Sequence, residues 1–214
     1  MKLYLSIIFG TVAVLIAVFT PLAPFFEITY WWAVLTVLIF AFAVFMVNCY
    51  LGIFLRLPPI EIYAPRQLLF KTLKVEKTVY KTIKVRQWKM KVVDAGKLFG
   101  FHPKDKLAKI SDPDYLYRFL CEMGYAEIVH IAAIIFGVVP FLLSFLLLPV
   151  WWHGAIFLAP IVAVNAFLNL LPIFVQRNNR PSMIRLYKRA CRIRRRAEEA
   201  KALKAANAQA NGVQ

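Results

Sequence analysis

Two ionisable side chains, Glu127 and His130, lie three residues apart where a long apolar stretch begins. Because an α-helix turns once in about 3.6 residues, the two share one helix face. Ionisable groups that enter a bilayer are costly and are commonly functional. Histidine is the side chain best suited to take a proton near neutral pH, and a carboxylate can orient its ring. We therefore expect His130 to be a general base and Glu127 to be its partner. Helical residues three apart need not bond each other, so the partner could instead come from another helix.

A second polar set lies in the fourth apolar stretch and ends in two arginines. Steps of four, three and four residues place its first members on one helix face: Asn165, Asn169, Pro172 and Gln176. Asn165 and Asn169 are expected to make structural hydrogen bonds between membrane helices, as is Asn48 in the second stretch. Arg177 and Arg180 follow, and a guanidinium at a membrane surface can bind phosphate or carboxylate in a fork. We expect these two arginines to bind substrate, with a role as snorkelling anchors as the alternative.

A third candidate set lies in the basic segment Val85–Gly96. Trp88 suits the membrane interface, where its ring is buried and its N–H stays hydrated. Lys89, Lys91 and Asp94 could bind a phosphate or orient a substrate, or they could form a solvated face. His102, in the loop that follows, is expected to be exposed to solvent.

The elements that carry these residues are membrane helices. The chain has 214 residues, of which 61% are hydrophobic, and its mean hydropathy is +0.62, which excludes a soluble domain. About 20 apolar residues cross the hydrocarbon of a bilayer. Four stretches are long enough: Leu3–Phe19, Tyr30–Leu55, Ile128–Val150 and Gly154–Val175. We therefore predict an all-α, multi-pass membrane protein with four transmembrane helices.

The basic residues predict the orientation of these helices. Of 27 Lys and Arg, one precedes the first stretch, fifteen lie between Arg56 and Arg118, and eleven follow the fourth. The two short turns, near residues 21–27 and 149–153, contain none, which is the positive-inside pattern. Both termini and the central segment are thus predicted to be cytoplasmic. The charge of +16 is expected to face anionic headgroups and substrates, with no nucleic-acid partner.

The termini and the cysteines add little chemistry. The N-terminus resembles a signal peptide but lacks a good cleavage site, so we expect it to be a retained anchor. No cysteine lies in an outer turn, so a disulfide framework is not expected from Cys49, Cys121 and Cys191.

The connecting segments divide the chain into four parts. Pro58-Pro59 ends the hairpin of residues 1–57. In the segment 58–111, lysines recur at helical spacing from Arg66 to about Lys91, with Leu69, Leu73 and Tyr80 on another face, which predicts an amphipathic interfacial helix. A helix start at Asp112-Pro113, with no stop signal after it, begins the hairpin of 112–181 that carries the site. A separate basic amphipathic helix is expected after Pro181, and disorder beyond about Ala205, within 182–214.

Three segments of the sequence together resemble one known family. They are Val85–Gly96 with Arg-Gln-Trp-Lys-Met-Lys-Val-Val-Asp, Glu122–His130 with Ala-Glu-Ile-Val-His, and Pro172–Pro181 with Pro-Ile-Phe-Val-Gln-Arg-Asn-Asn-Arg-Pro. In order and spacing they are similar to the glycosyl-4,4′-diaponeurosporenoate acyltransferases, small bacterial membrane proteins that place a fatty acyl chain on the sugar of a glycosylated carotenoid. The likeness runs from about Arg66 to Arg196. It implies catalytic or substrate-binding roles for Trp88, Lys89, Asp94, Glu122, Glu127, His130, Gln176, Arg177, Asn179 and Arg180.

The resemblance implies acyl transfer from acyl-CoA or another acyl thioester to a hydroxyl of a membrane glycolipid, without a cofactor. Membrane lipids, the donor and the acceptor would be the partners. The residues permit this reaction, with His130 as base and the two arginines holding donor phosphates or a developing oxyanion. The alternative is a non-catalytic membrane subunit or lipid-binding scaffold, in which the same residues hold the hairpin and the headgroups.

Other catalytic signatures are missing. The His-x-x-x-x-Asp motif of glycerolipid acyltransferases is absent, because the fifth residues after the three histidines are Leu107, Ile135 and Leu158. There is no serine nucleophile elbow. Paired Glu-x-x-His motifs build di-metal sites in helical bundles, but this chain has one copy, so no metal site is expected.

Overall fold

The computed structural model describes residues 2–26, 29–65, 70, 72–92, 109–147 and 151–211. Within these ranges every regular element is helical, which confirms the all-α prediction. In chain order the elements are α1 (Lys2–Leu22), η1 (Ala23–Phe26), α2 (Tyr30–Phe54), η2 (Ile60–Tyr63), α3 (Lys74–Thr82), α4 (Val85–Trp88), η4 (Lys89–Lys91), α5 (Pro113–Phe136), α6 (Val139–Leu147) and α7 (Trp151–Asn211).

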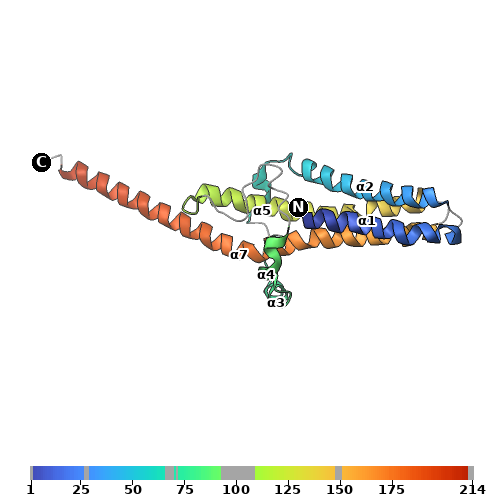
Figure 1. Cartoon of the computed structure of the whole chain (residues 1–214). Helices are drawn as coiled ribbons and strands as arrows, with labels where there is room; N and C mark the ends of the chain where they lie inside the picture. Colours follow the sequence, from blue (N-terminus) through green and yellow to red (C-terminus); the bar gives the residue numbers. More distant parts are fainter. Residues whose placement is uncertain are drawn as a thin grey trace.

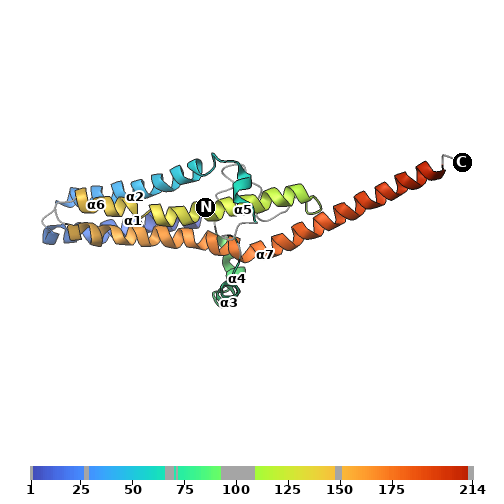
Figure 2. The ribbon, with the colours of Figure 1, turned by 180° about the vertical axis from the view of Figure 1, so that it is seen from behind.

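Among the described residues, four helical stretches are long and apolar enough to cross a membrane: Ser6–Phe25, Tyr30–Phe54, Pro113–Leu146 and Leu158–Asn207. They confirm the four predicted spans and make the chain a multi-pass membrane protein. The α1–α2 hairpin packs beside α6 and the first half of α7 (Figures 1 and 2). Their shared core consists of Leu15, Phe19, Val37, Val44, Leu158 and Ile161. On the outside, large apolar side chains such as Trp31, 83% exposed, form the surface that a bundle presents to lipid.

The longest pairing joins α5 and α7, which run side by side beyond the end of the α1–α2 hairpin (Figure 1). The predicted start of α5 is confirmed, because the Asp112 side chain accepts hydrogen bonds from the backbone N–H groups of Asp114 and Tyr115. The outer part of this pairing is held by an apolar core: Leu116, Leu120, Met123, Met183 and Ala190. Glu127 and His130 therefore lie on a helix that packs against α7 both before and after them in the sequence.

The predicted uninterrupted helix through residues 128–150 is broken between α5 and α6, within the residues 128–147 that the structure describes. α5 ends at Phe136 and α6 begins at Val139, one residue before Pro140. Proline has no N–H to donate to the preceding turn, which weakens a helix at this point. A Cβ on Gly137 would lie 2.2 Å from the Asn165 amide nitrogen, so only glycine lets Asn165 approach α5 this closely.

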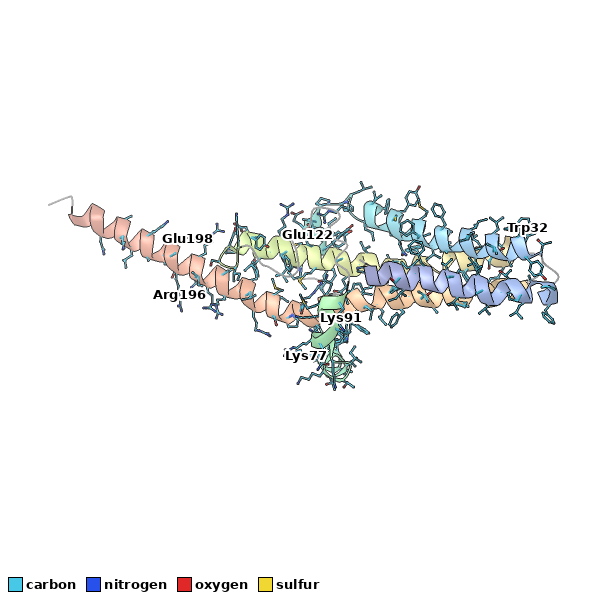
Figure 3. All side chains as sticks on the ribbon, viewed as in Figure 1. Trp32, Lys77, Lys91, Glu122, Arg196 and Glu198 are labelled. Atoms are coloured by element: carbon cyan, nitrogen blue, oxygen red, sulfur yellow. The ribbon has the colours of Figure 1, made fainter. Side chains whose placement is uncertain are left out.

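The amphipathic segment between the second and third spans differs from the single helix expected from Arg66 to about Lys91. α3 begins only at Lys74, and Lys84, with φ of 52°, separates it from α4. Of the residues expected to share its apolar face, Tyr80 is buried and Leu73 is exposed; Leu69 lies outside the described residues. The segment projects sideways from α7, and the labelled Lys77 and Lys91 extend from it in Figure 3.

The separate helix expected after Pro181 is instead a continuation of α7. This helix runs without interruption from Trp151 to Asn211 and contains Pro160, Pro172 and Pro181. Its basic last part projects beyond the bundle (Figures 1 and 2). α7 also remains helical past Ala205, where the composition predicts disorder. The prolines are tolerated because packing against neighbouring helices compensates for the main-chain hydrogen bonds they remove.

The arrangement generates a prediction about topology. The last turn of α1 and the first turn of α2 lie at the same end of the bundle as the end of α6 and the start of α7, while α3, α4 and the basic last part of α7 lie toward the other end (Figure 1). After replacement of the native cysteines, Thr29→Cys should react with a membrane-impermeant maleimide in intact cells. Lys81→Cys should react only after permeabilisation. The opposite labelling pattern would contradict a cytoplasmic position for α3 and both termini.

Candidate functional site

Glu127 is the centre of the charged cluster at the α5–α7 contact. Its side chain is 0% exposed. One carboxylate oxygen is 2.6 Å from Nη1 of Arg177, and the other is 2.8 Å from Nη2 of Arg180. Both arginines come from α7, three residues apart, so they reach Glu127 from one helix face. In the structure, therefore, the Glu127 carboxylate forms ion pairs with both arginines.

Arg177 also ties α3 to this cluster. Its Nε and Nη2 donate to the two carboxylate oxygens of Glu76, at 2.9 and 2.7 Å. Burial raises the pKa of Glu76, but the hydrogen bonds from Arg177 and Tyr80 outweigh it, so that the pKa lies below its usual value. Tyr80 donates its hydroxyl to Glu76 at 3.0 Å, and burial together with this bond raises the pKa of Tyr80 to about 12. The side chains of Arg177, Glu76 and Tyr80 thus hold α3 against α7.

Arg180 is bound differently from Arg177. Its guanidinium is 1% exposed and lies over the ring of Phe70, with Cζ 4.5 Å from the ring centroid. The contact with Glu127 does not have the alignment of a hydrogen bond, and within the described part of the chain Nε, Nη1 and Nη2 have no hydrogen-bond partner. A buried guanidinium has five N–H groups, and leaving them unsatisfied is costly. The side chain is therefore suited to receive an acceptor-rich ligand.

The predicted residues of the segment after α3 partly join this cluster. Lys89 donates from Nζ to Oδ1 of Asn179 on α7 at 3.3 Å. Trp88 donates its indole N–H to the Ile83 carbonyl at 2.8 Å, and its ring packs on the core of Tyr80, Val85, Val92 and Val175. Gln176 is buried at 8% exposure. Asp94 and His102 lie outside the described residues.

Glu122 belongs to a separate contact between α5 and the end of α2. Its carboxylate forms two hydrogen bonds with the guanidinium of Arg56, at 2.5 and 2.8 Å. Arg56 also lies 4.9 Å from the centroid of the Tyr125 ring, and the Tyr125 hydroxyl donates to the carbonyl of Gly52. Figure 3 shows Glu122 on α5, on the side toward the end of α2. These contacts describe a connection between helices, whereas the substrate role of Glu122 stays a prediction.

His130 is held by an amide. Its Nδ1 is 2.8 Å from Oδ1 of Asn169 on α7. Asn169 in turn bonds to Asn165, and Asn165 bonds to the Ala133 carbonyl and to Asn48 of α2. The expected interhelical hydrogen bonds of the asparagines are therefore present. The position at His130 Nδ1 expected for Glu127 is occupied by Asn169, so the partner comes from another helix.

Sequence reasoning did not assign a role to Glu76 or to Asn169 in the site. A signal for Glu76 exists, because it is the one acidic residue among the lysines between residues 71 and 91. For Asn169 the helical spacing to Gln176 and Arg177 was visible, but a hydrogen bond to His130 depends on a contact across 39 residues of sequence.

Comparison with known proteins adds the family. The model of the glycosyl-4,4′-diaponeurosporenoate acyltransferases matches residues 59–189, a range that starts after α2 and ends within α7. The chain belongs to this family. No curated protein and no solved structure matches it. The matched range contains Glu76, Glu127, His130, Arg177 and Arg180. Because the family consists of acyltransferases, the protein is a membrane acyltransferase of carotenoid glycolipid biosynthesis.

The charged cluster generates a prediction about stability. Glu127→Ala leaves two buried guanidinium groups without their shared carboxylate, so the free energy of unfolding should fall by about 3–5 kcal/mol. The double variant Glu127→Leu/Arg180→Met removes one charge of each sign and should recover most of this loss. Thermal unfolding in detergent measures both.

A matched control is available on the exposed part of α7. Glu198 pairs with Arg194 at 3.1 Å, and both side chains are more than half exposed. Glu198→Ala should cost less than about 1 kcal/mol, because solvent screens such a pair. Equal effects of Glu127→Ala and Glu198→Ala would contradict the buried cluster.

Proposed function

We propose that this acyltransferase moves a fatty acyl chain from an acyl thioester to a hydroxyl of a membrane glycolipid, with His130 as the general base. The observation that carries the proposal is the 2.8 Å contact of His130 Nδ1 with Asn169, which holds an imidazole within the hairpin of a membrane acyltransferase. Near neutral pH imidazole is the side chain best suited to accept a proton from a hydroxyl.

The reaction needs one proton to move twice. His130 takes the proton of the acceptor hydroxyl as its oxygen attacks the thioester carbon. The new C–O bond forms, the C–S bond breaks, and the imidazolium returns the proton to the departing thiolate. The products are the acylated glycolipid and the free thiol, so the step balances without an oxidant or a cofactor. A positioned base contributes about 10²–10⁴-fold to the rate of such a transfer.

Arg180 is proposed to bind an anionic part of the acyl donor. Its buried donors, which have no hydrogen-bond partner among the described residues, and its stacking on Phe70 support this assignment, and Lys89 contacts the same turn of α7 through its bond to Asn179. A guanidinium fork suits phosphate oxygens. Arg177 is proposed to hold the site together, because its donors already serve Glu76 and Glu127.

The spacing along α7 favours a donor phosphate over the oxyanion as the ligand of Arg180. Eleven residues separate Asn169 from Arg180, so their Cα atoms are about 16 Å apart along the helix axis. An oxyanion must lie about 3 Å from its donors and equally close to the nucleophile. A phosphate of the donor can lie farther from the reacting carbonyl. We propose that the donor enters from the basic, cytoplasmic side and the glycolipid from the bilayer.

The base assignment generates a prediction about His130→Gln. Glutamine keeps much of the volume and hydrogen-bonding capacity of histidine but does not act as a base near neutral pH. Acyl transfer by the purified protein should therefore fall by about 10²-fold or more, with expression and thermal unfolding close to wild type. The assay follows acylation of extracted glycolipid with acyl-CoA as donor. Wild-type turnover by His130→Gln would contradict the mechanism, and is what a non-catalytic scaffold would give.

The two arginines should separate in kinetics. Arg180→Lys keeps a positive charge beside Glu127 but loses the planar fork, so the donor KM should rise about 10-fold with little change in unfolding temperature. Arg177→Lys breaks the two-pronged contact with Glu76, so it should release α3, detected as faster trypsin cleavage around Lys77 and Lys81. An unchanged donor KM in Arg180→Lys would contradict donor binding at this residue.

A further inference from the structure

The hydrogen bonds around His130 contain enough fixed points to assign the amide orientations of Asn165 and Asn169 and the role of Nδ1 of His130. Nδ2 of Asn165 lies 3.0 Å from the carbonyl oxygen of Ala133. Nδ2 of Asn169 lies 3.0 Å from both the main-chain oxygen and Oδ1 of Asn165. Oδ1 of Asn169 then lies 2.8 Å from Nδ1 of His130. This series of hydrogen bonds runs from Ala133 of α5 to the two asparagines of α7 and back to His130 of α5.

Two main-chain carbonyls determine the direction of this chain. A carbonyl oxygen only accepts hydrogen bonds, so the atom of Asn165 that faces Ala133 must be its NH₂ group. For the same reason the NH₂ group of Asn169 must face the main-chain oxygen of Asn165. The amide oxygen of Asn169 is therefore turned to His130. This assignment does not depend on a choice between the two nearly equivalent amide orientations.

The tautomer of His130 follows from the same geometry. An amide oxygen accepts, so Nδ1 of His130 must carry the hydrogen and donate it. In a neutral imidazole only one nitrogen is protonated, and the lone pair then belongs to Nε2. Nε2 is thus the ring nitrogen able to take a proton. This is the arrangement that a catalytic base needs, obtained with a neutral amide in place of a carboxylate.

The anchor of the chain depends on a glycine. A Cβ at Gly137 would lie 2.2 Å from Nδ2 of Asn165 and 2.5 Å from the Ala133 carbonyl oxygen. Asn165 is 7% exposed and also accepts a hydrogen bond from Asn48 of α2 at 2.7 Å. The amide that directs Asn169 is therefore enclosed by three helices and has little freedom to turn over.

We propose that Asn169 is a positioning residue that fixes His130 in the tautomer protonated at Nδ1 and presents Nε2 as the base, with Asn165 as its anchor. The inference rests on the proposed function, in which His130 takes the proton of the acceptor hydroxyl. Its structural part, the tautomer, can be measured without any acyl-transfer assay.

The experiment combines a spectrum with kinetics on the full-length protein in nanodiscs. Histidine labelled with ¹⁵N distinguishes protonated from unprotonated ring nitrogens, and the signals of His130 among the three histidines are those lost in His130→Gln. At pH 8, above the ordinary histidine pKa of about 6.5, wild type should show a protonated Nδ1 and an unprotonated Nε2. This measurement needs no variant of Asn169, so it holds even where such a variant fails to fold.

Three variants test the role of the amide. Asn169→Leu should mix the two tautomers and lower kcat about 10-fold, equivalent to about 1.4 kcal/mol, with the donor KM unchanged. Asn169→Asp keeps an oxygen that accepts from Nδ1–H and, as the protonated acid, an O–H that replaces the NH₂ donor to Asn165, so it should retain the tautomer and keep kcat within about 3-fold of wild type. Ser144→Ala is the matched control: it removes a buried hydrogen bond, from Ser144 to the Phe141 carbonyl in α6, that is not linked to the asparagines or to His130, and it should leave tautomer and kcat unchanged.

The outcomes separate this inference from the proposed function. A wild-type His130 protonated at Nε2 would overturn the role of Asn169, while a loss of acylation in His130→Gln would still support the base. Equal losses of kcat in Asn169→Leu and Ser144→Ala would also overturn it, since a general structural role predicts that result. A third outcome is wild-type acylation by His130→Gln together with a protonated Nδ1 in the wild-type spectrum. It would overturn His130 as the base and, with it, the catalytic role of the contact between Asn169 and His130.

Discussion

The arrangement of this protein depends on neutralising one carboxylate that is withdrawn from water. An isolated buried ion costs several kcal/mol, so Glu127 is stable only where Arg177 and Arg180 reach it together. This requirement fixes the position of α5 along α7. It also determines where the basic segment docks, because the guanidinium that neutralises Glu127 is the one that binds Glu76 of α3. Three separate stretches of sequence are therefore aligned by two charges on one helix.

The same constraint explains why His130, the proposed base, is contacted by an amide. Both oxygens of Glu127 are turned toward arginines, so the hydrogen-bond acceptor at His130 comes from Asn169. A neutral amide brings no charge that must be desolvated, which suits it to the part of the bundle where α2, α5 and α7 meet among apolar side chains. Charged groups that can hold an anion and neutral groups that direct a proton are thus separated along α7, with the charged groups toward its basic end.

Local sequence signals predicted the elements whose stability is local. The four spans follow from apolar length, and the start of α5 follows from the Asp112 cap, because both depend on residues adjacent in sequence. The course of α7 through Pro181 could not be predicted in this way. There the rule for proline is overridden by packing, since Leu116 and Leu120 of α5 form a core with Met183 and Ala190 on the far side of the proline.

The residues of the candidate site also divide into those that local sequence signals could predict and those that depend on contacts distant in sequence. His130, Arg177 and Arg180 could be chosen from the sequence, because ionisable groups beside apolar stretches are rare enough to be informative. Their partners could not, since Glu76 meets Arg177 across 101 residues and Asn169 meets His130 across 39. The orientation of the Asn169 side chain was even less predictable from the sequence than its contact with His130. It depends on a main-chain carbonyl of α5 that Asn165 reaches only because residue 137 has no side chain. The proposed tautomer of His130 therefore depends on a glycine seven positions further along the chain, and only the three-dimensional arrangement connects the two.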